Sequence, residues 1–491
     1  MPLVVNSNIS ALNAQRNLNR SQADLTTSLQ RLSSGLRINS AKDDAAGLAI
    51  ADRMTSQVRG LNQAVRNAND GISVAQVAEG ALGEVTNALQ RMRELAVQSA
   101  NDSNSATDRA SLQKEVSALA QEITRLATQT QFNGKNLLDG SFSSGVFQIG
   151  AYSGQTISFG IGSAKATDIG SNQASSNARI GATTLAAAAD VTGGNGVAGQ
   201  TLTVSGTTGT ANAGVSANAS ARDIAAAVNG VSATTGVTAT ARTETTIGSL
   251  SAPGTVSFKL YGSNGTGVDI SANVVSTSDL SALSDAINAK TASTGITAEL
   301  SSNKASIKLV SAEGYDIKVE NFVHSGDSGQ TMAVGGVALT GPTTGSPAAT
   351  DSIVIGGTVS FSSPTSFSVS TSAAGTVFGS ATNNSSLSAV GSINIGTQTG
   401  ASSALGVIDG ALSFVNNLRA DLGAVQNRFN SVVSSNQATA ENVTAARSRI
   451  QDADFAAETA NLSRAQILQQ AGTAMLAQAN QSSQNVLSLL R

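Results

Sequence analysis

Apolar residues near both ends of the chain recur every three or four positions, the spacing of one face of an α-helix. The first series steps by seven, four, three and four residues, through Leu18, Leu25, Leu29, Leu32 and Leu36. Similar series occupy residues 75–96, 112–126 and 407–432. These patterns predict long helices with coiled-coil seams at both ends of the chain.

The helix predicted around residues 407–432 carries a second apolar stripe, formed by Leu405, Ile408, Leu412 and Val415. A helix with two apolar faces must be covered on both, either by its own chain or by a neighbouring subunit. The terminal segments, residues 9–36 and 455–491, carry a stripe each, and isolated helices are marginally stable. We therefore expect the two termini to pair with each other and then with other chains. The alternative is an intramolecular coiled coil without assembly.

The candidate residues for this assembly are Leu25, Leu29, Leu32, Leu36, Phe455, Leu462, Leu468, Met475, Leu476, Val486 and Leu490. Between the helices lie short connectors. Residues 37–47 break the heptads, and Asp43 and Asp44 are placed to cap the following helix. Residues 101–105 separate two further helices, with Ser103 to Ser105 as plausible N-caps.

The middle of the chain has a different character. All but twelve of the 48 glycines lie in residues 141–401, and residues 3–252 and 365–491 contain no proline. Alternating apolar and polar positions in residues 147–161 predict a β-hairpin, and those in 201–204 and 256–260 predict strands. Helical arms flanking a β-rich middle are therefore expected.

The middle also contains a repeat. Residues 224–229 and 235–239 have counterparts 59 positions later, in residues 283–288 and 294–298. Both units are expected to form a short helix, a turn and a strand. Two copies are too few for a solenoid, so they predict duplicated α+β modules in an outer domain.

Composition limits the chemistry that this chain can perform. It has no Cys and one His, His324, which excludes thiol nucleophiles, disulfides, multi-His zinc sites and histidine-based triads. Charged residues make up 12% and the net charge is −3, so no general attraction to nucleic acid is expected. We expect a protein that is not an enzyme and needs no cofactor or metal.

Sequence signals for membranes and export are also missing. No run approaches 18 apolar residues, so no membrane insertion is expected. Residues 1–6 lack the basic and apolar regions of an ordinary signal peptide. Taken alone, these features would favour a cytoplasmic protein.

Two local motifs have simpler interpretations than catalysis. Residues 194–199 match GxGxxG, but a strand-like segment follows where a helix should begin, so a loop is expected. The acidic pairs Asp43/Asp44 and Asp452/Asp454 flank helices and are expected to act as caps or ion-pair partners rather than as glycosidase carboxylates.

Several segments closely resemble bacterial flagellin. They are LQRLSSGLRINSAKDDAAG (29–47), NANDGIS (67–73), QRMRELAVQS (90–99), DLGAVQNRF (421–429) and the stretch from AARSRI (445–450) through AMLAQAN (474–480). The resemblance covers about residues 1–170 and 400–491. The Asn-containing repeat of the middle is similar to the short repeat of some flagellin outer domains.

The resemblance implies a layered, mixed fold: a coiled-coil rod of paired terminal segments with a β-hairpin, and a central β-rich α+β outer domain. Its expected domains are 1–42 with 450–491, which form the inner tube, 43–172 with 402–449, which form the rod, and 173–401, which is surface-exposed. It implies a structural subunit that self-polymerises into the extracellular flagellar filament for motility. Export in unfolded form through the flagellar type III apparatus would replace a signal peptide.

The resemblance also implies partners. Besides other copies of the chain, these are a flagellar export chaperone, filament cap and hook-junction proteins, and a host Toll-like receptor. The implied receptor residues are Gln90, Arg91, Arg93, Leu95 and Glu115. Residues 486–491 are similar to a tail read by a cytosolic innate sensor. Two alternatives remain open: an adhesin or hook-associated junction protein with the same terminal helices, and an enzyme displayed by the middle domain.

Overall fold

The computed structural model describes residues 7–181, 186–326, 329–342 and 349–488, with side chains up to Gln481. The chain divides into two compact units, each built from segments that are far apart in sequence. The terminal unit comprises Met1–Val77, Ser143–Gly160 and Asp421–Arg491. The central unit comprises Ala78–Phe142 and Ile161–Ala420.

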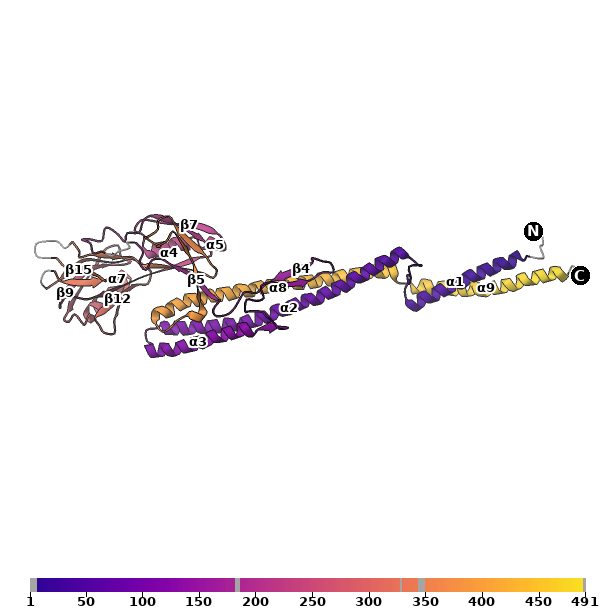
Figure 1. Ribbon diagram of the computed structural model, residues 1–491, viewed down its shortest axis with the longest axis horizontal. Helices are drawn as coiled ribbons and strands as arrows, with labels where there is room; N and C mark the ends of the chain where they lie inside the picture. Colours follow the sequence, from indigo (N-terminus) through magenta and orange to yellow (C-terminus); the bar gives the residue numbers. More distant parts are fainter. Residues whose placement is uncertain (1–6, 182–185, 327–328, 343–348, 489–491) are drawn as a thin grey trace. The chain divides into compact units, whose positions relative to one another are not determined.

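Two helices from opposite ends of the chain lie side by side in the terminal unit (Figure 1): α1 (Ile9–Ser34) and α9 (Phe455–Ser488). Asn8 caps α1, and α1 ends at Gly35, whose φ of 71° is left-handed and costs glycine no strain. Asp454 caps α9, because its Oδ1 accepts two N–H groups of the first turn at 2.9 and 3.2 Å.

Three further helices form the predicted rod: α2 (Ala45–Ala100), α3 (Ala106–Gln129) and α8 (Gln398–Gln451). α3 begins with a capping box in which Ser105 and Asp108 satisfy each other's backbone N–H groups. Within the central unit the three helices run alongside one another (Figure 1). They bury Leu82, Val85, Leu89, Met92 and Leu95 from α2, Val116 and Ile123 from α3, and Ile408, Ala411 and Val415 from α8.

A β-hairpin packs on the helices of the terminal unit. Its strands are β3 (Gly145–Gln148) and β4 (Thr156–Phe159), and Phe147 pairs with Ile157. The rings of Phe147 and Phe159 stack at 5.4 Å, and both meet Phe429 of α8 edge-on at 5.6 and 6.1 Å. Gly71 of α2 leaves room for the Phe429 ring, because a Cβ there would lie 2.7 Å from Phe429 Cζ.

The β-rich middle contains antiparallel sheets. The largest has the order β11 (Ile296–Leu300), β12 (Ser306–Ser311), β8 (Thr238–Gly248), β17 (Thr358–Ser363), β5 (Gly170–Ser175), β20 (Ser386–Ala389), with β14 (Thr331–Val334) joining β8 to β15 (Val337–Thr340). One four-stranded sheet has the order β10 (Val268–Val274), β9 (Gly254–Tyr261), β13 (Ile317–His324), β16 (Ile353–Ile355). The other has the order β19 (Thr382–Asn384), β18 (Ser368–Thr371), β6 (Gln200–Ser205), β7 (Thr210–Val215).

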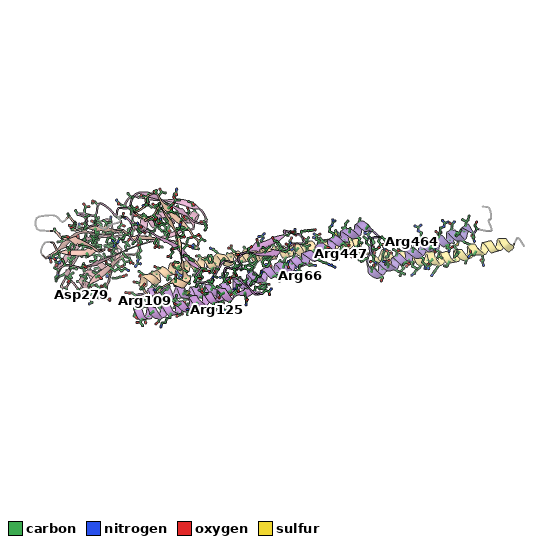
Figure 2. The ribbon with its side chains drawn as sticks, in the orientation of Figure 1. Arg66, Arg109, Arg125, Asp279, Arg447 and Arg464 are labelled. Atoms are coloured by element: carbon green, nitrogen blue, oxygen red, sulfur yellow. The ribbon has the colours of Figure 1, made fainter. Side chains whose placement is uncertain are left out.

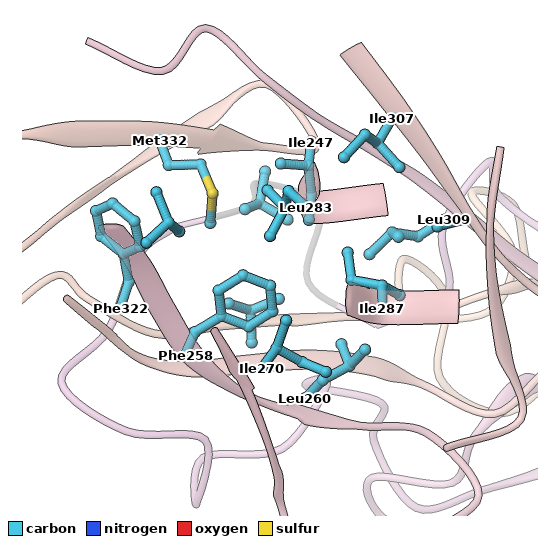
Figure 3. Packing of buried hydrophobic residues seen from close by; sticks show 14 of the residues in the cluster. Ile247, Phe258, Leu260, Ile270, Leu283, Ile287, Ile307, Leu309, Phe322 and Met332 are labelled. Atoms are coloured by element: carbon cyan, nitrogen blue, oxygen red, sulfur yellow. The ribbon is translucent and has the colours of Figure 1, made fainter. Parts of the chain in front are cut away.

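Short elements complete the chain. They are the ribbon β1 (Gln131–Phe132) with β2 (Lys135–Asn136), the helices α4 (Ala221–Asn229), α5 (Ser232–Thr235), α6 (Ser281–Asn288) and α7 (Thr291–Thr294), and the 3-10 turn η1 (Val390–Ser392). The sheets and these helices enclose two apolar clusters. Figure 3 shows part of one, in which Phe258, Leu283, Ile287 and Phe322 converge from strands β9 and β13 and from helix α6.

The predicted repeat forms two modules of the same construction. β6, β7, α4, α5 and β8 follow in the same order as β9, β10, α6, α7 and β11. In the first module the Asn229 side chain exchanges two hydrogen bonds of 2.8 and 2.7 Å with the backbone of Ala239. Asn288 makes the same pair with Ala298, at 2.9 and 2.8 Å. Each asparagine thus substitutes for a neighbouring strand.

A buried carboxyl lies beside the first module, on Asp316. Asn195 Nδ2 donates to both of its oxygens at 3.2 and 3.0 Å. Burial raises the pKa of Asp316 to about 6, against the opposing effects of the Asn195 hydrogen bonds and Lys318, while Asp223 adds a small rise. One neutral amide donor does not replace the hydration of an ionised carboxylate.

The structure confirms the mixed fold class, with paired terminal helices and a β-rich middle. Two local predictions were wrong. Leu36 lies beyond the end of α1, because Gly35 terminates that helix, and it pairs as an isolated bridge with Asp452. Asp43 does not cap α2: it accepts the N–H groups of Asn39 and Ser40 and closes the preceding turn.

The remaining local predictions hold. Asp44 accepts the N–H of Gly47 at the start of α2 (2.9 Å), and Ser105 is the N-cap of α3. The second stripe of α8 is covered by the chain itself, since Ile408 and Val415 are buried while Leu405 and Leu412 are half-buried. The two half-buried leucines leave part of that stripe accessible to a neighbouring subunit.

The two glycines Gly71 and Gly83 of α2 give a matched test of the Phe429 contact. Gly71→Ala is expected to lower the free energy of unfolding by about 1–3 kcal/mol, because its methyl group would overlap the ring. Gly83→Ala meets nothing within 4 Å and is expected to raise it by about 1 kcal/mol through helix propensity. Thermal unfolding of the monomer followed by circular dichroism measures both; equal effects would refute the packing argument.

The Asp316 carboxyl predicts a pH-dependent stability. Its folded pKa is raised above the unfolded value, so the folded state binds more protons between about pH 4 and pH 6 and loses stability as the pH rises through that window. Asp316→Asn is expected to stabilise the protein at pH 7 by about 2–3 kcal/mol and to have little effect at pH 4. Calorimetry at both pH values tests this.

The control for that measurement is Asp190→Asn, since hydrogen bonds from Thr192 lower the pKa of the exposed Asp190 carboxyl. Its contribution therefore has the opposite sign. An Asp316→Asn effect that is independent of pH would contradict the assignment.

Candidate assembly surface and recognition patch

The α1–α9 pair leaves large apolar side chains in contact with solvent. Each is at least half exposed: Ile9 60%, Leu12 54%, Leu29 50%, Phe455 56%, Ile467 64%, Leu468 51% and Met475 62%. Single exposed apolar side chains are common on soluble proteins, but seven on two adjacent helices indicate an interaction surface. We call these seven residues the assembly surface.

The candidate assembly residues fall into three groups. Leu29, Phe455, Leu468 and Met475 belong to the assembly surface. Leu25, Leu32, Leu462 and Leu476 are half-buried, as is Leu36 beyond the helix end. Val486 lies in α9 beyond the last described side chain, and Leu490, with the rest of residues 489–491, lies outside the described residues.

Three members of the assembly surface were not among the candidates: Ile9, Leu12 and Ile467. Ile467 directly precedes Leu468, and a single heptad stripe includes only one residue of that pair. Two paired helices cover only a narrow seam between them. Two apolar residues next to each other in sequence cannot both lie in that seam, so such a pair signals that one apolar side chain stays uncovered. Ile9 and Leu12 lie in the first turn of α1.

A short backbone joint links the segment that follows α1 to the segment that precedes α9. Arg37 N–H donates to the carbonyl of Gln451 at 2.7 Å, and Ala453 N–H donates to that of Gly35 at 3.0 Å. Leu36 and Asp452 face each other between these bonds. The joint thereby fixes where both terminal helices begin to pair.

The receptor residues implied by the resemblance lie on α2 and α3 of the central unit. Arg91 donates to Glu94 at 2.9 Å and to Glu115 at 2.8 Å, and these bonds raise the pKa of the Arg91 guanidinium. Gln90 is exposed beside them. The arrangement is an exposed, charged patch in which two carboxylates hold the arginine.

Two other residues of this set lie differently. Arg93 donates to Asp409 of α8 at 2.7 Å, and this contact raises the pKa of Arg93. Leu95 is 1% exposed and packs in the helical core beneath the patch. We call Gln90, Arg91, Arg93 and Glu115 the recognition patch; Leu95 supports the helix that carries it.

The remaining candidate chemistry is structural. His324 is buried, its Nδ1 accepts the N–H of Gly326 at 2.9 Å, and its Nε2 lies 3.0 Å from the carbonyl of Ala252. The GxGxxG segment is a loop that leads into strand β6. In the described part of the chain, no three His, Cys, Asp or Glu side chains gather closely enough to hold a metal ion.

A search of the described helices for a membrane span was also negative: none combines the length and hydropathy that a crossing requires.

Known families match most of the chain. The bacterial flagellin N-terminal helical region matches residues 5–143, and the bacterial flagellin C-terminal helical region matches residues 405–490. The flagellin hook IN motif matches residues 201–252 and 255–313, which contain the two modules described above. The two ends and the repeated middle therefore match regions of one protein family.

Full-length relatives agree with these matches. B-type flagellin of Pseudomonas aeruginosa is 47% identical over 100% of both chains. Flagellin of Salmonella typhimurium is 38% identical and flagellin B of Vibrio cholerae 36% identical, again over 100% of both chains. The chain therefore belongs to the bacterial flagellins.

Proposed function

We propose that this flagellin polymerises by burying the assembly surface of its α1–α9 pair against other copies of itself. As a flagellin, the chain is a structural, non-enzymatic subunit of the extracellular flagellar filament, a homopolymer that serves motility. What supports the proposed site is the set of seven large apolar side chains that the helix pair leaves exposed.

Burying the exposed part of this surface favours association. Fully burying one large apolar side chain is worth about 1.5–3 kcal/mol, and the seven are about half exposed, so each retains roughly 1 kcal/mol. Every copy in a polymer contributes this surface, whereas the helical core of the central unit is already covered by its own chain. Assembly therefore draws chiefly on α1 and α9.

The same reasoning supports a layered division of the subunit. Residues 1–42 with 450–491 would form the inner tube, 43–172 with 402–449 the rod with its hairpin, and 173–401 the outward-facing domain. The joint at Gly35–Arg37 and Gln451–Ala453 falls close to the first boundary, and the start of α8 falls close to the second. The two repeated modules lie wholly within the outer domain.

We also propose a route of export and three further partners: an export chaperone, and the cap and hook-junction proteins at the two ends of the filament. The chain would pass unfolded through the flagellar type III apparatus, which suits a sequence without disulfides. A flagellar export chaperone would cover the apolar face of α9 before secretion, because exposed apolar helices otherwise aggregate. Filament cap and hook-junction proteins would contact the terminal helices at the two ends of the polymer.

The recognition patch is proposed as the surface read by a host Toll-like receptor. Its support is geometric: Gln90, Arg91, Arg93 and Glu115 are exposed on two adjacent helices and present oriented charges. Arginine is enriched among the residues that carry most of the binding energy at protein interfaces. Leu95 would contribute by holding α2 in place beneath the patch.

Removal of α9 tests the proposed assembly site. Deleting residues 455–491 is expected to abolish polymerisation, because α1 loses its partner and the polymer loses four of the seven exposed apolar side chains. Helices α2, α3 and α8 should stay folded, because their core lies outside the deleted segment. Seeded assembly followed by sedimentation and electron microscopy measures the first effect, and circular dichroism measures the second.

A point variant separates the apolar contacts from the helix itself. Ile467→Gln with Met475→Gln is expected to slow seeded elongation by about tenfold or more without loss of helix, since both side chains are exposed in the monomer. The matched control is Gln470→Ala with Gln478→Ala, on exposed polar positions of the same helix. Filaments formed at the normal rate by the truncated chain would overturn the proposal.

A further inference from the structure

A tight turn follows the helix α3. This helix, on which Figure 2 labels Arg125, ends at Gln129 and leads through Thr130 into the ribbon of β1 and β2. Asn133 and Gly134 form the two-residue loop of the ribbon, with φ angles of 48° and 76°. Positive φ at both loop positions is the geometry that an Asn-Gly step favours in a two-residue hairpin. The sequence therefore explains the turn, but it also brings a reactive dipeptide there.

An Asn-Gly step can react with itself, because glycine has no Cβ to hinder the approach. The backbone nitrogen of the glycine attacks the side-chain carbon Cγ of the asparagine, and a new C–N bond forms. The Cγ–Nδ2 bond breaks, and the proton of the attacking N–H leaves with the departing ammonia. Water then opens the resulting succinimide ring at either carbonyl, which gives aspartate or isoaspartate. Overall, water is consumed, ammonia is released and no electrons are transferred.

Four Asn-Gly steps occur in the chain, and all are in the described residues: 133–134, 195–196, 229–230 and 264–265. Three of the asparagine side chains use both ends of the amide in hydrogen bonds. Asn195 Nδ2 donates to the carbonyl of Ala219 at 2.9 Å, and its Oδ1 accepts the N–H of Val197 at 3.0 Å. The attacking nitrogen is also engaged at this step, because the N–H of Gly196 donates to Asn218 Oδ1 at 3.2 Å.

The asparagines of two further steps are held in the same way. Asn229 exchanges with Ala239 the pair of hydrogen bonds described above. Asn264 Oδ1 accepts the N–H of Gly262 at 2.7 Å, and its Nδ2 donates to the carbonyl of Thr266 at 2.6 Å. Rotating either amide toward the next backbone nitrogen would break hydrogen bonds that the fold makes, so both side chains are protected.

Asn133 differs from these three asparagines. Its side chain is exposed and makes no hydrogen bond with the described residues, and the N–H of Gly134 has no acceptor among them. A Cβ placed on Gly134 would meet nothing within 4 Å, so the space around the attacking nitrogen is open. β1 and β2 have two residues each, so the turn can open by breaking few hydrogen bonds. Within the described chain, the turn itself is thus the only restraint on this side chain.

We propose that Asn133 is a site of spontaneous modification, at which the folded chain deamidates to aspartate and isoaspartate much faster than at its other Asn-Gly steps. The aspartyl product adds a negative charge and leaves the backbone length unchanged, and Asp tolerates a left-handed φ as Asn does. The isoaspartyl product inserts an extra carbon into the backbone of the turn. Because Leu137 and Leu138 follow directly and are buried, this product should disturb the pairing of the ribbon.

Ageing of the purified full chain in mildly alkaline buffer, followed by peptide mapping with mass spectrometry, tests the proposal. Deamidation of Asn133 is expected to be about tenfold or more faster than that of Asn195, Asn229 or Asn264, since losing one net hydrogen bond corresponds to about that factor. In denaturant the four rates should converge, because the fold no longer distinguishes the sites. Asn133→Gln should lose the fast reaction, because its longer side chain would have to close a larger ring.

The outcomes separate the alternatives. Native-state deamidation at Asn133 that is no faster than at the other three asparagines would overturn the proposal. A chain in which Asn133 reacts in denaturant but not in the folded state would also overturn it, because the turn would then protect the side chain. Both isomers of the product are expected, since water can open the ring from either side; aspartate alone would indicate direct hydrolysis of the amide and would contradict the succinimide route.

Discussion

The structure depends on a simple constraint: two helices side by side can cover one apolar seam, but not both sides of a wide apolar face. In the central unit three helices pack together, and Leu89, Met92 and Ile123 are fully buried. α1 and α9 have only each other, and Ile467 and Met475 remain largely exposed. The chain thus has a helical core that it covers by itself and a pair of terminal helices whose apolar side chains we propose are covered by other copies.

The hairpin and the repeated modules obey the same constraint in other ways. The hairpin is held by a cluster of three aromatic rings, which requires the bare backbone of Gly71 on the facing helix. Each module closes its helix onto a strand through an asparagine side chain, Asn229 or Asn288. Both devices complete a core within one chain.

Much of the helical architecture could be predicted from the sequence, because periodicity of apolar positions reports which side of a helix is covered. Caps such as Ser105 were also predictable, since capping is local. The errors and omissions have a common origin. Leu36 continued the heptad spacing, yet Gly35 ended the helix one residue earlier. The contacts Asn195–Asp316 and Arg31–Glu458 join residues far apart in the chain, and no local pattern marks them.

The candidate site was predicted in part for the same reason. Leu468 and Met475 belong to a regular series and were found, whereas Ile467 was missed, because its exposure depends on how wide a face the partner helix covers. Leu95 looked like part of a charged recognition motif, but its position in the α2 periodicity places it in the core. Position within a motif and accessibility in the fold are separate properties.

Oxidation of methionine in monomer and filament tests the central claim most directly. Met475 is 62% exposed in the monomer, while Met92 and Met332 are 0% and 1% exposed and serve as internal controls. Dilute peroxide followed by mass spectrometry measures sulfoxide formation at each site. We expect Met475 to oxidise readily in the monomer and to be protected in the filament; equal oxidation of Met475 in both states would contradict the account.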